Sequence, residues 1–230
     1  MVDKISSTGA EVVIYGNQWA ESDEYLRNFV MKSADSTTLA VYCHPFDNPV
    51  IWEGHATMID EIATQLPDQN SLKGVVCSVG GGGLYNGIVT GLKRNKLSTL
   101  PVLAIETEPA ACLAASLEAG KVVKLESVNT IAKSLAAQFV SEQAFVFANG
   151  GHPTKSLVIS DAQAVNSTVK FAEDHGITVE PACGAALAVV YENLWDKYLP
   201  NLTKSDCVVI IVCGGSATSL DDLIMLRNSL

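Results

Sequence analysis

Four consecutive glycines stand where a protein could bind a phosphate group. Gly80, Gly81, Gly82 and Gly83 follow an apolar run and precede a stretch with helical spacing. Glycine lets the backbone approach a ligand closely, and the start of a helix presents unpaired N–H groups. The flanking residues complete neither a Walker A loop nor a GxGxxG dinucleotide motif. We therefore predict a cradle for one phosphate group, with a flexible or tightly packed turn as the alternative.

A second glycine turn follows another apolar run. Cys213, Gly214, Gly215 and Ser216 come directly after residues 207–212. Ligands of open parallel sheets bind beyond the carboxyl ends of the strands, so both glycine turns are expected to open onto one crevice. The spacing alone leaves two interpretations of Cys213, a buried core thiol or a ligand contact.

Short apolar runs alternate with helical patterns along the chain. Strands are expected at 11–15, 74–79, 101–105, 157–159 and 207–212, and a further short apolar run lies at 39–43. Helices are expected at 21–32, 52–65, 84–95, 110–119, 161–175, from Pro181 in the first turn through 185–199, and after the second glycine turn. Continuous apolar strands between helices are typical of a parallel sheet covered on both faces. The sequence thus predicts an α/β fold, with a boundary near 47–49.

Polar residues and glycine mark the ends of two expected helices. Asp161 is expected to cap the helix that runs to His175, and Gly176 to end it. Ser219 and Asp222 have the spacing of a capping box at the start of the last helix.

The charge balance excludes one class of function. The chain has 15 lysines and arginines against 25 aspartates and glutamates, a net charge of −10. A protein that binds nucleic acid through a basic surface needs clustered cations, so that function is excluded. Only 17% of the residues are charged and 48% are apolar. A chain this apolar is not disordered, and its low charge implies a deep core or a large face for a partner.

Cysteine usage and apolar run lengths indicate where the protein works. None of the six cysteines forms a CxxC pair, which argues against zinc-ribbon and thioredoxin-type sites and favours a reducing cytoplasm. No histidine has the spacing of a zinc site. The first residues lack the apolar core of a signal peptide, and no apolar run approaches the ~18 residues of a membrane span.

Four stretches together resemble the catabolic L-serine/L-threonine dehydratases. They are 45–55 (Pro-Phe-Asp-Asn-Pro-Val-Ile-Trp-Glu-Gly-His), 78–84 (Ser-Val-Gly-Gly-Gly-Gly-Leu), 180–187 (Glu-Pro-Ala-Cys-Gly-Ala-Ala-Leu) and 212–216 (Val-Cys-Gly-Gly-Ser). The resemblance covers essentially the whole chain in the right order. It implies the fold-type II pyridoxal-phosphate lyases, similar to the tryptophan synthase β subunit. Residues 49–230 would form most of the large cofactor-phosphate-binding domain, and 1–48 the remnant of an incomplete small α/β domain.

The resemblance also implies roles for individual residues. The turn at 80–83 and the backbone of Leu84 would hold the phosphate of pyridoxal 5′-phosphate. Cys213 would face the pyridine nitrogen, where a thiol, unlike an aspartate, does not keep that nitrogen protonated and so suits elimination. Ser134 would pack against the ring face, and Glu106 would line a site for a monovalent cation.

The implied reaction is β-elimination, which converts serine to pyruvate and ammonia and threonine to 2-oxobutanoate and ammonia. The lysine that anchors the cofactor in this family lies in a Ser-Phe-Lys-x-Arg-like motif, and the sequence contains none. Lys32 and Lys133 lack the preceding Ser-Phe, so no catalytic residue is assigned. We therefore expect an N-terminally truncated chain that is inactive on its own.

Other functions stay open beside the dehydratase. The chain could be a non-catalytic subunit that binds phosphate or cofactor, or one half of a split dehydratase. A cysteine- or threonine-synthase-like enzyme is disfavoured, since those relatives more often carry serine or threonine where Cys213 stands. The expected small-molecule partner is the amino-acid substrate of the full enzyme. The expected protein partner is a second copy of the chain in a homodimer, or a separate N-terminal fragment. Without such a partner we expect poor solubility.

Overall fold

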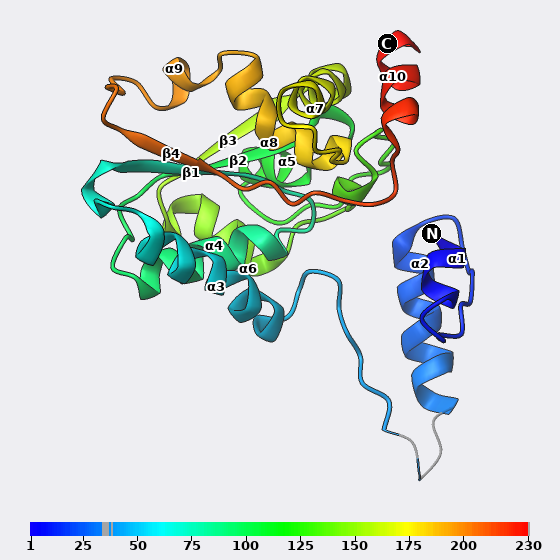
Figure 1. Cartoon of the computed structure of the whole chain (residues 1–230). Helices are drawn as coiled ribbons and strands as arrows, with labels where there is room; N and C mark the ends of the chain where they lie inside the picture. The colour runs from blue at the N-terminus through cyan, green and yellow to red at the C-terminus, as the bar shows by residue number, and fades with distance from the viewer. Residues whose placement is uncertain (34–36, 38, 230) are drawn as a thin grey trace. The chain divides into compact units, whose positions relative to one another are not determined.

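A computed structural model describes residues 1–33, 37 and 39–229 (Figure 1). The chain divides into two compact units, Met1–His44 and Pro45–Leu230. The sequence places the boundary between 48 and 49, close to this division. That the first unit is the remnant of a small domain stays a prediction.

The second unit contains a parallel four-stranded sheet. Its strands are β1 (Leu72–Ser78), β2 (Val102–Thr107), β3 (Thr154–Ile159) and β4 (Cys207–Ile210). The strand order is β3-β2-β1-β4, and all three strand pairs are parallel. The carboxyl ends of the strands, from which both glycine turns leave, therefore meet at one edge of the sheet.

Helices cover both faces of this sheet, as predicted. In chain order they are α3 (Pro49–Gln65), α4 (Gly83–Arg94), α5 (Cys112–Ala119), α6 (Glu142–Val146), α7 (Asp161–His175), α8 (Pro181–Tyr191), α9 (Trp195–Tyr198) and α10 (Leu220–Ser229). Figure 1 shows α3, α4 and α6 on one side of the sheet and α7 and α8 on the other. The expected start of a helix at Pro181 is confirmed, but the single helix expected from there through 199 is divided, because Asn193 takes a positive φ of 56° between α8 and α9.

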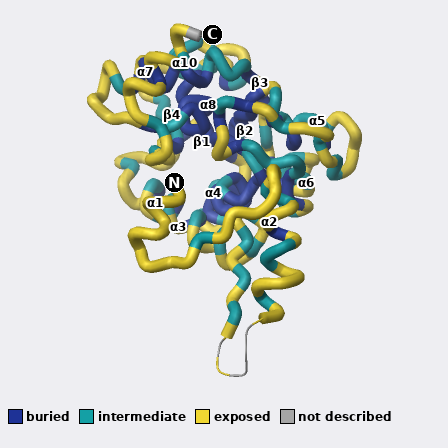
Figure 2. Tube along the Cα trace, turned by 90° about the vertical axis from the view of Figure 1, so that its right-hand side faces the viewer, coloured by how far each residue is buried: buried dark blue, intermediate teal, exposed yellow. Residues whose placement is uncertain are grey.

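The core lies on both faces of the strands. Val75 and Cys77 of β1 pack with Ile88 of α4, whereas Val76 packs with Leu103 of β2 and Ala185 of α8 in a second cluster. Successive side chains of a strand point to opposite faces, so a strand covered on both faces is apolar along most of its length. The burial colours of Figure 2 place this core along β1, β2, α4 and α8. No helix in the described parts of the chain is long and apolar enough to span a membrane.

Capping residues explain where two helices begin. The expectation that Asp161 caps α7 is wrong: Ser160 is the cap, and it forms a capping box with Gln163. Asp161 is already helical, and its carboxylate accepts from Thr130 Oγ1 at 2.6 Å and Ile131 N at 2.8 Å. The end of α7 at Gly176, with φ 67°, is confirmed.

The predicted capping box of the last helix is also confirmed. Ser219 N donates to Asp222 Oδ2 at 2.9 Å, and Asp222 N donates to Ser219 Oγ at 3.1 Å. Each end residue thereby satisfies a backbone N–H group of the other, which explains why α10 begins at Leu220.

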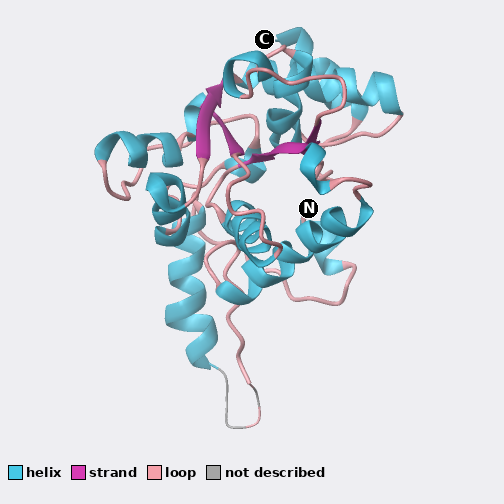
Figure 3. Ribbon diagram, turned by 90° about the vertical axis from the view of Figure 1, so that its left-hand side faces the viewer, coloured by secondary structure: helices cyan, strands magenta, loops and turns pink. Residues whose placement is uncertain are grey.

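The first unit is helical where it has regular structure. It contains α1 (Val2–Ser6), α2 (Trp19–Tyr25), a π-helical turn (Leu26–Val30) and a 3-10 turn (Met31–Ser33), which confirms the helix expected at 21–32. The strand expected at 11–15 is wrong, and the apolar run at 39–43 forms no strand in its described residues. All strands in Figure 3, drawn in magenta, belong to the second unit. A strand needs a neighbour to satisfy its backbone groups, and the described residues offer 11–15 none.

Candidate functional site

The first glycine turn joins β1 to α4 at the carboxyl edge of the sheet. Gly82 is the N-cap of α4 and has φ 92°, a conformation that favours glycine. Its three neighbours place the start of a 12-residue helix directly after the strand. The predicted strand–turn–helix arrangement around 80–83 is confirmed.

Hydrogen bonds orient this turn with its N–H groups left unpaired. Three carbonyl oxygens face the protein: Gly80 O accepts from Cys112 Sγ (3.4 Å), Gly81 O from Ser141 N (3.0 Å) and Gly82 O from Asn86 N (2.9 Å). Within the described residues, the N–H groups of 81–84 donate to no acceptor. Unpaired N–H groups at a helix start are the feature that binds a phosphate, so the turn fits the phosphate of pyridoxal phosphate.

Close packing also requires glycine at these positions. A Cβ at Gly80 would meet Leu135 Cα at 3.1 Å, one at Gly82 would meet Ala144 Cβ at 2.6 Å, and one at Gly81 would overlap the ring of Phe46. Two requirements therefore act together on this turn. The Cα atoms pack against the protein, while the N–H groups of 81–84 have no acceptor among the described residues.

The second glycine turn follows β4 at the same edge of the sheet. Cys213 is exposed, which excludes the buried core thiol that the sequence left open. Gly214 and Gly215 follow with φ values of 85° and 118°. Partial burial of the sulfur atom, with a further contribution from Cys183, raises the pKa of Cys213 to about 11. The Cys213 thiol is therefore uncharged at neutral pH.

Glu180 links the second glycine turn to Ser134. Its Oε1 accepts from Ser216 N and Ala217 N, both at 2.8 Å, and its Oε2 accepts from Ser134 Oγ at 2.8 Å. Its own backbone N donates to Gly214 O at 2.9 Å. The stretch 180–187 stands out in the sequence, but the motif alone assigns Glu180 no role. An acidic residue directly before the proline that begins α8 was the available signal.

These contacts bring the predicted cofactor residues into one region. Gly80 of the first turn packs against the backbone of Leu135. Leu135 follows Ser134, whose hydroxyl is bound to Glu180, and Glu180 in turn holds the second turn beyond Cys213. The two glycine turns and Ser134 therefore form a continuous set of contacts. The ring-facing roles of Ser134 and Cys213 stay predictions.

Glu106 lies next to the last residue of β2 and is fully buried. Its two carboxylate oxygens accept from Leu113 N at 2.7 Å and Ala114 N at 2.8 Å, at the start of α5. Burial raises the pKa of Glu106 to about 7, although the two backbone bonds act in the opposite direction. The described residues contain no cluster of three acidic, histidine or cysteine side chains that could hold a metal ion. The role of Glu106 as a cation ligand stays a prediction.

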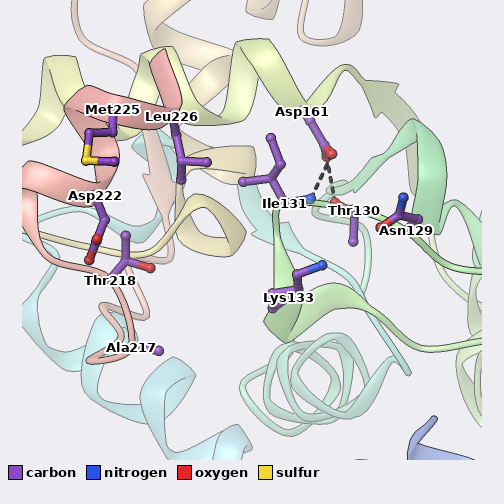
Figure 4. Close-up of a pocket in the computed structure, with 10 residues that line it drawn as sticks. All are labelled: Asn129, Thr130, Ile131, Lys133, Asp161, Ala217, Thr218, Asp222, Met225 and Leu226. Carbon is purple, nitrogen blue, oxygen red and sulfur yellow. Dashed lines mark hydrogen bonds between the residues drawn. The ribbon is translucent and has the colours of Figure 1, made fainter. Parts of the chain in front are cut away.

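A cavity of about 730 Å³ lies beside Ser134 and the second turn. Figure 4 shows its two walls. Asn129, Thr130, Ile131, Lys133 and Asp161 form one wall, and Ala217, Thr218, Asp222, Met225 and Leu226 form the other. Asp161 fixes the first wall through its bonds to Thr130 and Ile131. Among the described residues that line this cavity, Lys133 is the one lysine.

Comparison with known proteins identifies relatives along the whole chain. A sequence model of the pyridoxal-phosphate dependent enzyme family matches residues 1–214. The chain is 43% identical over 234 residues to the catabolic L-serine/threonine dehydratase of Saccharomyces cerevisiae, and 38% identical over 233 residues to the L-serine dehydratase/L-threonine deaminase of Bos taurus. These matches cover 97% and 100% of the chain but only 64% and 69% of the two relatives.

A solved structure agrees with these relatives. The structure of a fungal L-serine ammonia-lyase from Rhizomucor miehei matches with a TM-score of 0.89 and 36% identity. It covers 99% of this chain and 70% of the fungal chain. The match includes the sheet and both glycine turns described above. The chain therefore belongs to the family of pyridoxal-phosphate dependent enzymes, within the fold-type II group that the serine and threonine dehydratases share.

Proposed function

We propose that this chain provides the cofactor-phosphate-binding part of a lyase that eliminates water from L-serine or L-threonine and releases ammonia when water hydrolyses the resulting enamine to the 2-oxo acid. The observation that carries the proposal is the convergence of the two glycine turns and Ser134, with unpaired N–H groups at 81–84. The names of the yeast and bovine relatives support the substrate class. The chain spans about two thirds of their length, so the proposal concerns the whole enzyme of which these residues form a part.

Different groups of the site would bind different parts of the cofactor. The N–H groups of 81–84 would hold the phosphate of pyridoxal phosphate, and Ser134 and Cys213 would lie against its ring. When bound, this cofactor supplies an electron sink for the charge left by removal of an α-proton. An uncharged Cys213 thiol adds no negative charge at the ring nitrogen, which favours elimination over transamination.

We further propose that these 230 residues alone have no meaningful dehydratase turnover. No lysine stands in the motif that would hold the cofactor covalently and move the α-proton. General acid–base catalysis alone contributes typically ~10²–10⁴-fold to a rate. Cofactor held only by its phosphate is expected to bind without that contribution.

The test is pyruvate formation by the pure chain with pyridoxal phosphate and L-serine. We expect a rate equal to that of pyridoxal phosphate without protein. Robust turnover that disappears when one lysine is replaced would contradict the proposed inactivity, and Lys133→Ala is the first variant to examine because this lysine lines the cavity. Lys32→Ala serves as the control, since Lys32 lies in the first unit.

A second chain and a cation complete the proposal. We propose that the chain pairs with a segment carrying the lysine motif or with a second copy, in the cytoplasm, and the six free cysteines support that compartment. Co-expression with such a segment, followed by the pyruvate assay, tests the pairing; activity in the mixture is expected.

The cation proposal predicts that the chain has a higher melting temperature in K⁺ than in tetramethylammonium. It also predicts that this difference is lost in Glu106→Gln.

A further inference from the structure

We propose that Glu180 is a positioning residue that fixes the second glycine turn and Ser134 in one arrangement, so that Cys213 and Ser134 are presented together to the cofactor ring. The inference rests on the proposed function, because it assigns a task to a residue of the same site. Glu180 is distant in sequence from both segments that it joins: it lies 46 residues from Ser134 and 36 from Ser216. Its effect on them therefore depends on the fold and not on covalent connection.

The carboxylate of Glu180 is used by the turn and not by its own helix. Glu180 is the N-cap residue of α8, with extended backbone angles of φ −82° and ψ 157°, yet its side chain makes no capping bond. A residue at this position ordinarily accepts from the first turn of its helix. Here the two oxygens accept instead from two backbone N–H groups of the turn and from the Ser134 hydroxyl. Three donors from two segments of the chain therefore meet at one side chain.

The turn is shaped around this side chain. A Cβ on Gly215 would overlap the Cγ and Cδ atoms of Glu180. Gly215 has φ 118°, and Gly214 accepts from the backbone N of Glu180. Gly215 is therefore required where the chain passes closely over Glu180, whereas Gly214 is favoured only by its own φ of 85°. Cys213 directly precedes this pair, so the direction of its thiol depends on the contact.

Glu180 also connects the two walls of the cavity shown in Figure 4. Lys133, which lines one wall, precedes Ser134, and Ala217, whose N–H is bound to Glu180, lines the other. One carboxylate therefore sets the separation of the segments at 129–134 and 213–218. Loss of the side chain is expected to release Ser134 and the second glycine turn from each other, while Asp161 still holds Thr130 and Ile131.

The experiment compares three variants of Glu180 with the full chain. Glu180→Gln keeps an amide oxygen for both N–H groups and an NH₂ group that can donate to Ser134. Glu180→Asp keeps the charge but is one methylene too short to reach both partners. Glu180→Ala removes every side-chain contact, and Glu118→Ala, on the exposed end of α5, is the matched control. All are compared at a temperature where circular dichroism shows them folded.

Three readouts separate positioning from general stability. Amide hydrogen exchange at Ser216 and Ala217 reports the turn, the alkylation rate of Cys213 by peptide mass spectrometry reports the thiol, and fluorescence titration with pyridoxal phosphate reports the site. We expect Glu180→Ala and Glu180→Asp to raise exchange at both amides about tenfold or more, since their acceptor is lost. Both should change the Cys213 rate and weaken pyridoxal phosphate binding about tenfold. Glu180→Gln and Glu118→Ala should stay within about twofold of the unmodified chain on all three.

The outcomes distinguish this inference from the proposed function. Unchanged exchange and unchanged binding in Glu180→Asp would overturn the positioning role even where Glu180→Ala does not fold. A Glu180→Gln variant as impaired as Glu180→Asp would also overturn it, because hydrogen-bond geometry could not then be the cause. If the unmodified chain binds no pyridoxal phosphate, the proposed function fails and the cofactor part of this inference fails with it. The exchange result would then still decide whether Glu180 holds the turn.

Discussion

The thiol of Cys213 combines exposure with low acidity. The residue is accessible, yet partial burial of its sulfur atom and the nearby Cys183 raise the pKa of the thiol to about 11. The thiolate, and not the thiol, is the nucleophile that reacts with an alkylating reagent. The Cys213 side chain is therefore accessible to reagents, but its thiol reacts slowly at neutral pH. A catalytic cysteine would combine an accessible side chain with a low pKa. This supports a ligand contact that stays uncharged and does not act as a nucleophile.

The pH profile of Cys213 alkylation follows from this pKa. Because the folded-state pKa is raised, the thiolate fraction is small at pH 7.5 and keeps rising until the pH passes about 11. We expect iodoacetamide to modify Cys213 at least about tenfold more slowly at pH 7.5 than free glutathione, whose thiol has an ordinary pKa of about 8.5. Peptide mass spectrometry over pH 7 to 10 measures the rate. A plateau below pH 9 would contradict the raised pKa.

Glu180 shows what residue-level reasoning from sequence could not find. Spacing placed Cys213 among the candidates and the family resemblance added Ser134, but their connection runs through a side chain distant from both in sequence. Such a contact exists only once β4, α8 and the segment around Ser134 are packed together. Asp161 illustrates the same effect, because its carboxylate serves Thr130 and Ile131 instead of capping its own helix.

The positions of strands that are covered by helices on both faces, and of the helices that cover them, were the most predictable from sequence. The strands β1, β2 and β4 follow continuous apolar runs, and α4 and α7 end close to their expected residues. The run at 11–15 has the same composition but no strand, because pairing depends on a neighbour that composition does not encode. The helix expected from Pro181 through 199 is interrupted for a local reason, the positive φ of Asn193, which the pattern of apolar residues does not reveal.

The first glycine turn gives a prediction at the scale of an element. Gly82→Ala combines a φ of 92° with a Cβ that would lie 2.6 Å from Ala144 Cβ, so the turn must shift. We expect a loss of about 2–4 kcal/mol in unfolding free energy from strain and overpacking, and weaker binding of pyridoxal phosphate. Urea unfolding and fluorescence titration measure the two effects.

Gly120→Ala is the matched control for this turn. Gly120 has a φ of 66°, but a methyl group added there would meet nothing within 4 Å, so the substitution isolates the conformational cost. That cost is about 1–2 kcal/mol for a residue with a side chain in the left-handed region. Equal effects of the two substitutions on stability and on cofactor binding would show that the close packing at Gly82 does not shape the turn.

At the scale of the whole molecule, the low charge has two visible sources. The second unit buries apolar residues on both faces of its sheet, which accounts for much of the apolar composition. The first unit exposes apolar side chains instead: Ile14 is 78% exposed, Leu39 87% and Val41 71%. Exposed apolar area of this kind is stabilised when a partner or a second copy removes it from water.

This exposure predicts how the chain behaves in solution. We expect association that increases with protein concentration and decreases in the double variant Ile14→Ser, Leu39→Ser, since both substitutions remove exposed apolar area. Binding of pyridoxal phosphate should be unchanged, because the candidate site lies in the second unit. Sedimentation velocity at several concentrations measures the effect. A monomer at every concentration, in both forms, would contradict the expectation.

Binding of pyridoxal phosphate against pyridoxal tests the central claim most directly. The two ligands share a ring and an aldehyde, and only the first has the phosphate that the N–H groups at 81–84 are proposed to hold. Hydrogen bonds to a charged group contribute about 1.5–3 kcal/mol each, so losing even one weakens binding about tenfold or more. Calorimetric titration of the full chain should therefore show saturable binding of pyridoxal phosphate and at least about tenfold weaker binding of pyridoxal. Equal affinity for the two ligands, or no binding of either, would contradict the account.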